Sequence, residues 1–138
     1  MPIHYLIDND HRCVIKLWIG EITLEDWLIA ERQVMEAPNL PRNFKMLIDA
    51  RKVSAFKIGP ENVDEIVDFY ETYQDKVNGV RVAMLAGAFF KEAKMYERNV
   101  QPLGMNVIVF ANFDTACTWL NLDQGLVNEY LQQLQQES

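Results

Sequence analysis

The sequence has few of the residues that carry catalysis or covalent cross-links. Its 138 residues include only two cysteines and two histidines. The histidines, His4 and His11, lack the spacing of a dedicated metal site, and Cys13 and Cys117 fall in a strand pattern and a helix pattern. We therefore expect two buried thiols in a reducing compartment, no cofactor and no enzymatic activity.

Basic residues are also scarce relative to acidic ones. The 13 lysines and arginines face 20 aspartates and glutamates, which gives a net charge of −7. Nucleic acids and anionic membrane surfaces both require a basic face, so neither is expected as a partner. No apolar run approaches the roughly 20 residues of a membrane span. The N-terminus also lacks the basic and apolar regions of a signal peptide, so we expect a cytoplasmic protein.

The apolar residues that are present follow an α/β pattern over the whole length. Their spacing predicts strands at 3–7, 13–19, 44–51, 80–86 and 106–110. Helices are predicted between these strands, one of them running from Pro60 to Val77, and two more follow the last strand. We expect one domain, 1–138, with a mixed five-stranded sheet and an appended C-terminal helix over 124–135. The sheet would open with an antiparallel hairpin and continue as parallel βαβ units.

The stretch Phe44–Arg51 is predicted to be the central strand. Its uncharged run suits a strand that is covered on both faces. Arg51–Pro60 is then expected to be a loop at the carboxyl end of that strand, and Gly20 is expected to end the second strand. One residue from each of four elements is predicted to be buried in the core: Leu28, Ile48, Val67 and Trp119.

Three local patterns, together with the order of elements, resemble a known family. They are Leu47-Ile48-Asp49-Ala50-Arg51 with Val53 after it, Phe90-Lys91-Glu92-Ala93-Lys94-Met95-Tyr96 after a Val-Ala strand, and Val109-Phe110 followed by Ala116, Trp119 and Leu120. The family is the STAS domain, which includes anti-sigma-factor antagonists and the cytoplasmic domains of sulphate transporters. Uncharacterised bacterial STAS-like proteins are the most similar members. The resemblance covers residues 3–121 and implies the α/β fold described above.

The resemblance also bears on phosphorylation. Members that act as phosphorylation switches carry an aspartate and then a serine at the start of the following helix. Asp49 matches the first position, but Lys57-Ile58-Gly59 carries no hydroxyl at the second, and Ser54 lies too early. The resemblance therefore implies a relative that lacks the phosphoacceptor of the antagonists.

These observations favour a non-enzymatic interaction or regulatory module. The alternative is a carrier or sensor of a small apolar or anionic, lipid-like ligand bound at the carboxyl edge of the sheet. The partner would be a protein or a small ligand, and a homodimer is also compatible with the sequence.

Candidate binding residues lie where two parallel strands are expected to end at the same edge. They are Asp49, Arg51, Lys52, Phe56, Lys57, Phe89 and Phe90. The first segment runs into a helix N-terminus, which favours negative charge, and it carries three cations. The competing interpretation is structural: Asp49 would cap the following loop, and Phe56 and Ile58 would close the core.

Overall fold

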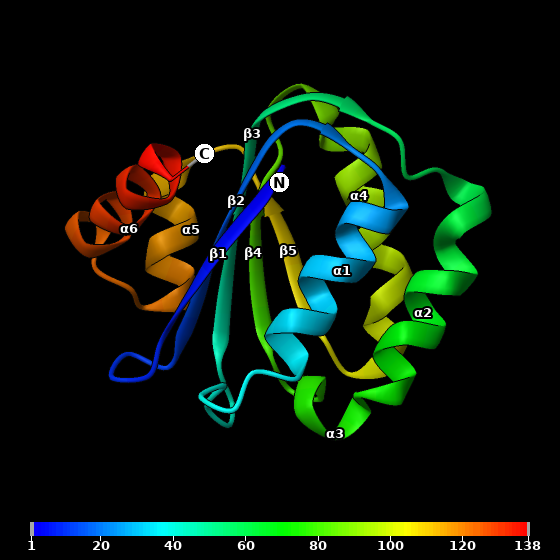
Figure 1. Ribbon diagram of the computed structural model, residues 1–138, viewed down its shortest axis with the longest axis horizontal. Coiled ribbons are helices and arrows are strands. Elements are labelled where there is room, and N and C mark those ends of the chain that lie inside the picture. The colour runs from blue at the N-terminus through cyan, green and yellow to red at the C-terminus, as the bar shows by residue number, and fades with distance from the viewer. Residues whose placement is uncertain (1, 138) are drawn as a thin grey trace.

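A five-stranded sheet forms the centre of the computed structural model, which describes residues 2–137 (Figure 1). The strands are β1 (Ile3–Asp8), β2 (Cys13–Ile22), β3 (Lys45–Phe56), β4 (Arg81–Leu85) and β5 (Asn106–Phe110), in the order β1-β2-β3-β4-β5. β1 is antiparallel to β2, and the other neighbours are parallel. The predicted α/β class, opening hairpin and central position of β3 are confirmed.

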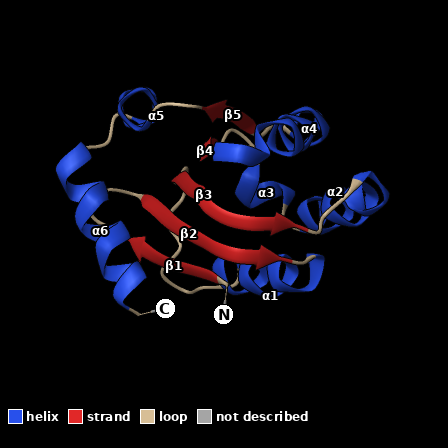
Figure 2. Cartoon of the chain, turned by 90° about the horizontal axis from the view of Figure 1, so that it is seen from above, coloured by secondary structure: helices blue, strands red, loops and turns tan. Residues whose placement is uncertain are grey.

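Helices cover both faces of the sheet (Figures 1 and 2). On one face lie α1 (Leu24–Met35), α2 (Val63–Thr72), α3 (Gln74–Val77) and α4 (Phe90–Val100), and on the other lie α5 (Phe113–Leu120) and α6 (Gln124–Gln136). Short 3₁₀ turns occupy Pro60–Asn62, Gly87–Phe89 and Gln101–Leu103. The single helix predicted from Pro60 to Val77 is therefore divided into a 3₁₀ turn, α2 and α3.

The alternation of side chains in the strands builds two separate cores. In β2, Val14 and Trp18 belong to the core beneath α1, α2 and α4, whereas Ile15 and Leu17 belong to the core beneath α5 and α6. Successive strand residues point to opposite faces, so a strand covered on both sides is apolar throughout. The uncharged run of Met46, Leu47 and Ile48 near the start of β3 has this cause.

The prediction of a loop over Arg51–Pro60 is wrong for most of that stretch, because β3 continues to Phe56. Val53 pairs with Gly20 and Phe56 pairs with Ile22 on the neighbouring β2. Gly20 therefore lies inside β2, with a φ of +77°, rather than at its end. Register shifts between Leu17 and Ile19 and between Gly20 and Glu21 interrupt the pairing of β2 with this part of β3, so the strand departs here from strict alternation.

The N-terminus of α1 is fixed by its capping residues. The Thr23 hydroxyl accepts a hydrogen bond from the Asp26 backbone nitrogen at 3.1 Å, and the Asp26 carboxylate accepts one from the Thr23 nitrogen at 3.2 Å. This capping box starts the helix at a defined residue. It thereby sets which side chains of α1 face the sheet, and Trp27 and Glu31 are among those buried.

Candidate functional site

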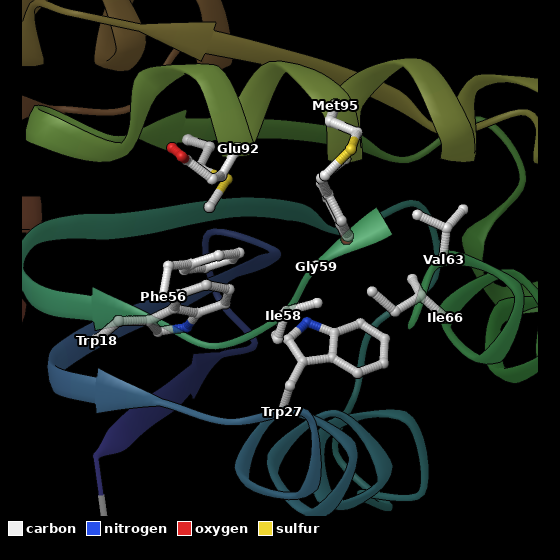
Figure 3. A pocket seen from close by; sticks show the side chains of 11 residues that line it. Trp18, Trp27, Phe56, Ile58, Gly59, Val63, Ile66, Glu92 and Met95 are labelled. Atoms are coloured by element: carbon white, nitrogen blue, oxygen red, sulfur yellow. The ribbon is translucent and has the colours of Figure 1, made fainter. Parts of the chain in front are cut away.

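An apolar cavity lies between the sheet and helices α1, α2 and α4, near the carboxyl ends of the central strands (Figure 3). Its volume is about 20 Å³, which is room for about one water molecule. The apolar walls come from β2, the end of β3, α1, α2 and α4, and they include Trp18, Trp27, Phe56, Ile58, Ile66 and Met95. Ligand sites in proteins usually enclose roughly 300–1,000 Å³, so this cavity has the apolar lining of such a site but not its volume.

The aromatic wall of the cavity depends on the extension of β3. Phe56 is the last residue of β3, and its ring stacks on Trp18 with centroids 6.1 Å apart. Phe89 lies against the same ring at a centroid distance of 6.4 Å. A loop at this position would hold Phe56 less rigidly than a strand paired to β2 does. The strand end therefore positions one side of the cavity.

Four of the residues that line the cavity carry a polar group in their side chain. They are Glu92, Tyr96, Trp18 and Trp27, the last two with an indole N–H. Trp18 is 2% exposed, and within residues 2–137 its Nε1 has no hydrogen-bond partner. A buried donor without a partner costs about 1–3 kcal/mol of stability. The indole N–H is therefore a group that a bound molecule could satisfy.

A buried polar network runs from the core to the cavity wall. Lys16 forms an ion pair with Glu31, and both side chains are 1% exposed. The Tyr70 hydroxyl donates to Glu31 Oε2 at 2.9 Å, and the hydroxyl oxygens of Tyr70 and Tyr96 are 2.5 Å apart. Because Tyr96 lines the cavity, the network connects the cavity to the buried ion pair.

Burial favours the uncharged form of both tyrosines and of the lysine in this network. It raises the pKa of Tyr70 and of Tyr96 well above the usual phenol value, so both hydroxyls keep their protons. Burial also lowers the pKa of Lys16. The adjacent Glu31 carboxylate opposes that effect, because an opposite charge favours the protonated amine.

Sequence reasoning missed Lys16 and Glu31. Lys16 lies in an otherwise apolar strand, Cys-Val-Ile-Lys-Leu-Trp-Ile, and Glu31 follows Trp27 by four residues. Residues four apart share one face of a helix, so a glutamate on the face of a buried tryptophan was the available signal. One cationic residue on a core-facing surface and one anionic residue on another indicate a buried ion pair.

A surface groove lies directly outside the cavity. It is lined by residues of α4 and by Pro60, and it includes the basic side chains Lys91 and Arg98. Glu92 and Met95 line both the groove and the cavity. These two side chains therefore form the partition between the apolar interior and the solvent.

Of the seven predicted binding residues, Asp49 and Arg51 form a pair away from the cavity. Asp49 is buried and accepts from Arg51 Nε and Nη2, each at 2.9 Å, and from the Arg51 backbone nitrogen at 3.1 Å. The Arg51 guanidinium lies 5.5 Å from the centre of the Phe113 ring, on the face covered by α5. Lys52 donates to Gln135 of α6 at 2.5 Å.

The remaining predicted residues are Phe56, Lys57, Phe89 and Phe90. Phe56 lines the cavity, and the half-buried Phe89 packs on the Phe56 ring without lining the cavity. Phe90 is 41% exposed, and Lys57 is also exposed. Of the seven predicted residues, only Phe56 lines the cavity. Whether any of them binds a partner stays a prediction.

Comparisons with known proteins identify the fold. Neither a protein-family model nor a curated protein matches the chain. One solved structure that does match is an uncharacterized protein of the DUF3478 family, with a SpoIIAA-like fold, from Shewanella loihica PV-4. The TM-score is 0.55 and the identity 15%, over 86% of this chain and 91% of the other. The chain therefore has the SpoIIAA-like, STAS-like fold that its element order predicts. Within residues 2–137, moreover, every helix is too short or too polar to span a bilayer.

Proposed function

We propose that this chain is a non-enzymatic carrier or sensor that binds a small apolar ligand between the sheet and α1, α2 and α4. The observation that carries the proposal is the aromatic and aliphatic cavity at the carboxyl edge of the sheet. Open α/β sheets bind ligands at this edge. The proposal takes up the second of the two functions that the sequence favours.

The cavity must enlarge when a ligand enters, because its present volume of about 20 Å³ holds little more than a water molecule. Phe56 and Met95 are half-buried, so their side chains can move without leaving the core entirely bare. Methionine is unbranched and adapts to new shapes at low cost. The side chains that divide the cavity from the outer groove are therefore the expected route of entry.

A second candidate function rests on the exposed side chains at the same edge. Lys57 and Phe90 are exposed, and the Arg51 side chain is 45% exposed. Exposed cations and an exposed aromatic ring at one edge of the sheet, on a chain of net charge −7, suit an acidic segment of a partner protein. Such a surface would suit the interaction or regulatory module, which is the function that the sequence favours over a carrier.

Native mass spectrometry of the freshly purified protein tests the main proposal, and a co-purifying apolar ligand is the expected result. Two matched variants on α2 then locate the site. Val63 and Val67 are both half-buried, but only Val63 lines the cavity. Val63→Phe should lower the affinity for the neutral fluorescent probe N-phenyl-1-naphthylamine about tenfold, whereas Val67→Phe should leave it unchanged. Equal effects of the two variants would contradict the proposed location.

A further inference from the structure

The outer surface of the helical layer carries opposite charges on two neighbouring helices, α2 and α4, which pack on each other. Asp64 and Glu71 are exposed on α2, and Lys91 and Arg98 are exposed on α4. Within residues 2–137, none of these four side chains takes part in an ion pair. The protein therefore presents an acidic stripe (Asp64 and Glu71) beside a basic stripe (Lys91 and Arg98), and both charges remain available to a partner.

Both stripes point away from the sheet. Asp64 and Glu71 are seven residues apart, as are Lys91 and Arg98, so each pair lies on one face of its helix about two turns apart. Successive residues are rotated by about 100° around a helix, which places these faces opposite the buried sides. The buried sides consist of Ile66, Phe69 and Tyr70 in α2 and of Ala93 and Val100 in α4.

The two helices also run in the same direction. α2 connects β3 to β4 and α4 connects β4 to β5, and these strands are parallel neighbours (Figure 1). Both helices therefore begin at the carboxyl edge of the sheet. Asp64 and Lys91 are each the second residue of their helix, and Glu71 and Arg98 are each the ninth. The acidic and basic stripes thus match in spacing and in their positions along the helices.

Half-buried apolar side chains lie on the sides of α2 and α4 that face each other. Val63 of α2 and Met95 of α4 line the same cavity, and Val67 follows Val63 by one helical turn. Glu92, half-buried beside Met95, adds one carboxylate to this strip. A partly apolar strip between two charged stripes has the arrangement of a protein interface, in which a polar rim surrounds a more apolar centre.

We infer that two copies of this chain associate through α2 and α4, about a two-fold axis that runs parallel to these helices and between them. Such an axis places α2 of each copy opposite α4 of the other, so the acidic stripe meets the basic stripe twice and the apolar strips meet at the axis. A two-fold axis across the helices would place like charges opposite each other, which is unfavourable. The matching number, sign and spacing of the charges make a second copy the partner that fits this surface.

This inference goes beyond the proposed function and does not depend on it. The dimer would cover the outer groove, because Lys91 and Arg98 line that groove. A ligand of the kind proposed above would therefore enter the monomer.

Sedimentation velocity of the full chain tests the association. At about 0.01 M salt we expect a particle of twice the 16.1 kDa of one chain, and at about 1 M salt the dissociation constant should rise at least about tenfold. The reason is that charges are screened beyond about 30 Å at the lower salt concentration and beyond about 3 Å at the higher one. A chain that stays monomeric at low salt up to millimolar concentration overturns the inference.

Charge reversal locates the interface. Asp64→Lys/Glu71→Lys makes both stripes basic, and Lys91→Glu/Arg98→Glu makes both acidic. Each variant alone should dimerise at least about a hundredfold less tightly, because attraction becomes repulsion at both symmetry-related contacts. An equimolar mixture of the two variants should dimerise again, since the basic stripes of one variant then face the acidic stripes of the other.

The matched control is Glu129→Lys/Glu137→Lys, which changes the net charge by the same amount at exposed positions of α6 and its C-terminal cap. This control should dimerise like the unaltered chain. If either double variant unfolds, the single variants Glu71→Lys and Arg98→Glu replace the pair in the same mixing scheme. The inference is overturned if the reversed variants still dimerise singly, or if their mixture remains monomeric.

Discussion

Replacing Lys16 by methionine tests how far the fold depends on the buried ion pair. Methionine has a similar length and no charge, so the substitution leaves Glu31 buried with only the Tyr70 hydroxyl beside it. Removing one partner of a buried pair costs about 3–5 kcal/mol, because the remaining charge has lost its compensation. Domains of this kind are stable by about 5–15 kcal/mol in total. Lys16→Met should therefore remove a large part of the free energy of unfolding.

The double variant Lys16→Met/Glu31→Leu shows whether the uncompensated charge is the cause. With both charges gone, most of the loss should be recovered, since apolar replacements of buried pairs are often neutral or stabilising. Tyr70 would then lack the acceptor for its proton, which costs about 1–3 kcal/mol. The double variant is therefore expected to fall between Lys16→Met and the unaltered protein.

Urea unfolding followed by far-ultraviolet circular dichroism measures these differences, provided that the slope with denaturant stays constant. The control is Lys57→Met, at an exposed position, which should change the free energy by less than about 0.5 kcal/mol. The reasoning is refuted if Lys16→Met costs less than about 1 kcal/mol. It is equally refuted if the double variant is less stable than the single one.

Two further predictions concern the turn after β4 and the docking of α6. Gly87 has a φ of +53°, and an added Cβ would meet a Cα atom of β3 at 3.3 Å, whereas Gly79 has a φ of +83° and open space. Both alanine variants should lose about 1 kcal/mol in urea unfolding, and Gly87→Ala should lose more. Burial raises the pKa of Asp8, but hydrogen bonds from Tyr130 and His11 outweigh it and lower the value below 3.8. The lowered pKa stabilises the fold above pH 3.8, and this contribution is lost as the pH falls through the folded value. Tyr130→Phe should therefore cost about 1.5 kcal/mol at pH 7, and less in acid, in the same assay.

The order of elements could be predicted because it depends on local periodicity. The degree to which each side chain is buried could not be predicted in the same way. Ile48 is 1% exposed, as predicted, but Leu28, Val67 and Trp119 are only half-buried. Spacing identifies the face of a helix that turns inward, whereas depth depends on how closely the next element approaches. The three misjudged residues lie on helices, and the correct one lies on the central strand.

The candidate site was predictable only in part, for a related reason. Phe56 ends β3 and Phe89 follows β4, its parallel neighbour, so their proximity could be expected from topology. Asp49 does not cap a loop, as the structural interpretation expected, because it lies inside β3 and accepts hydrogen bonds from Arg51 of the same strand. Each charge of the Lys16–Glu31 ion pair stands out on its own core-facing surface, but the contact between them joins a strand to a helix and depends on the tertiary fold.

The position of α6 has a consequence for the order in which the protein can fold during synthesis. α6 packs on β1 and β2, and its residues Val127 and Leu131 share one core with Ile15 and Leu17 of β2. Leu17 and Val127 are 110 residues apart in the sequence. At synthesis rates of about 5–20 residues per second, α6 is synthesised roughly 5–20 seconds after β2, and until then it cannot cover the apolar face of β2. A ribosome that has not yet reached residue 124 holds a sheet with one incompletely covered face, and that face is the surface that a chaperone would bind.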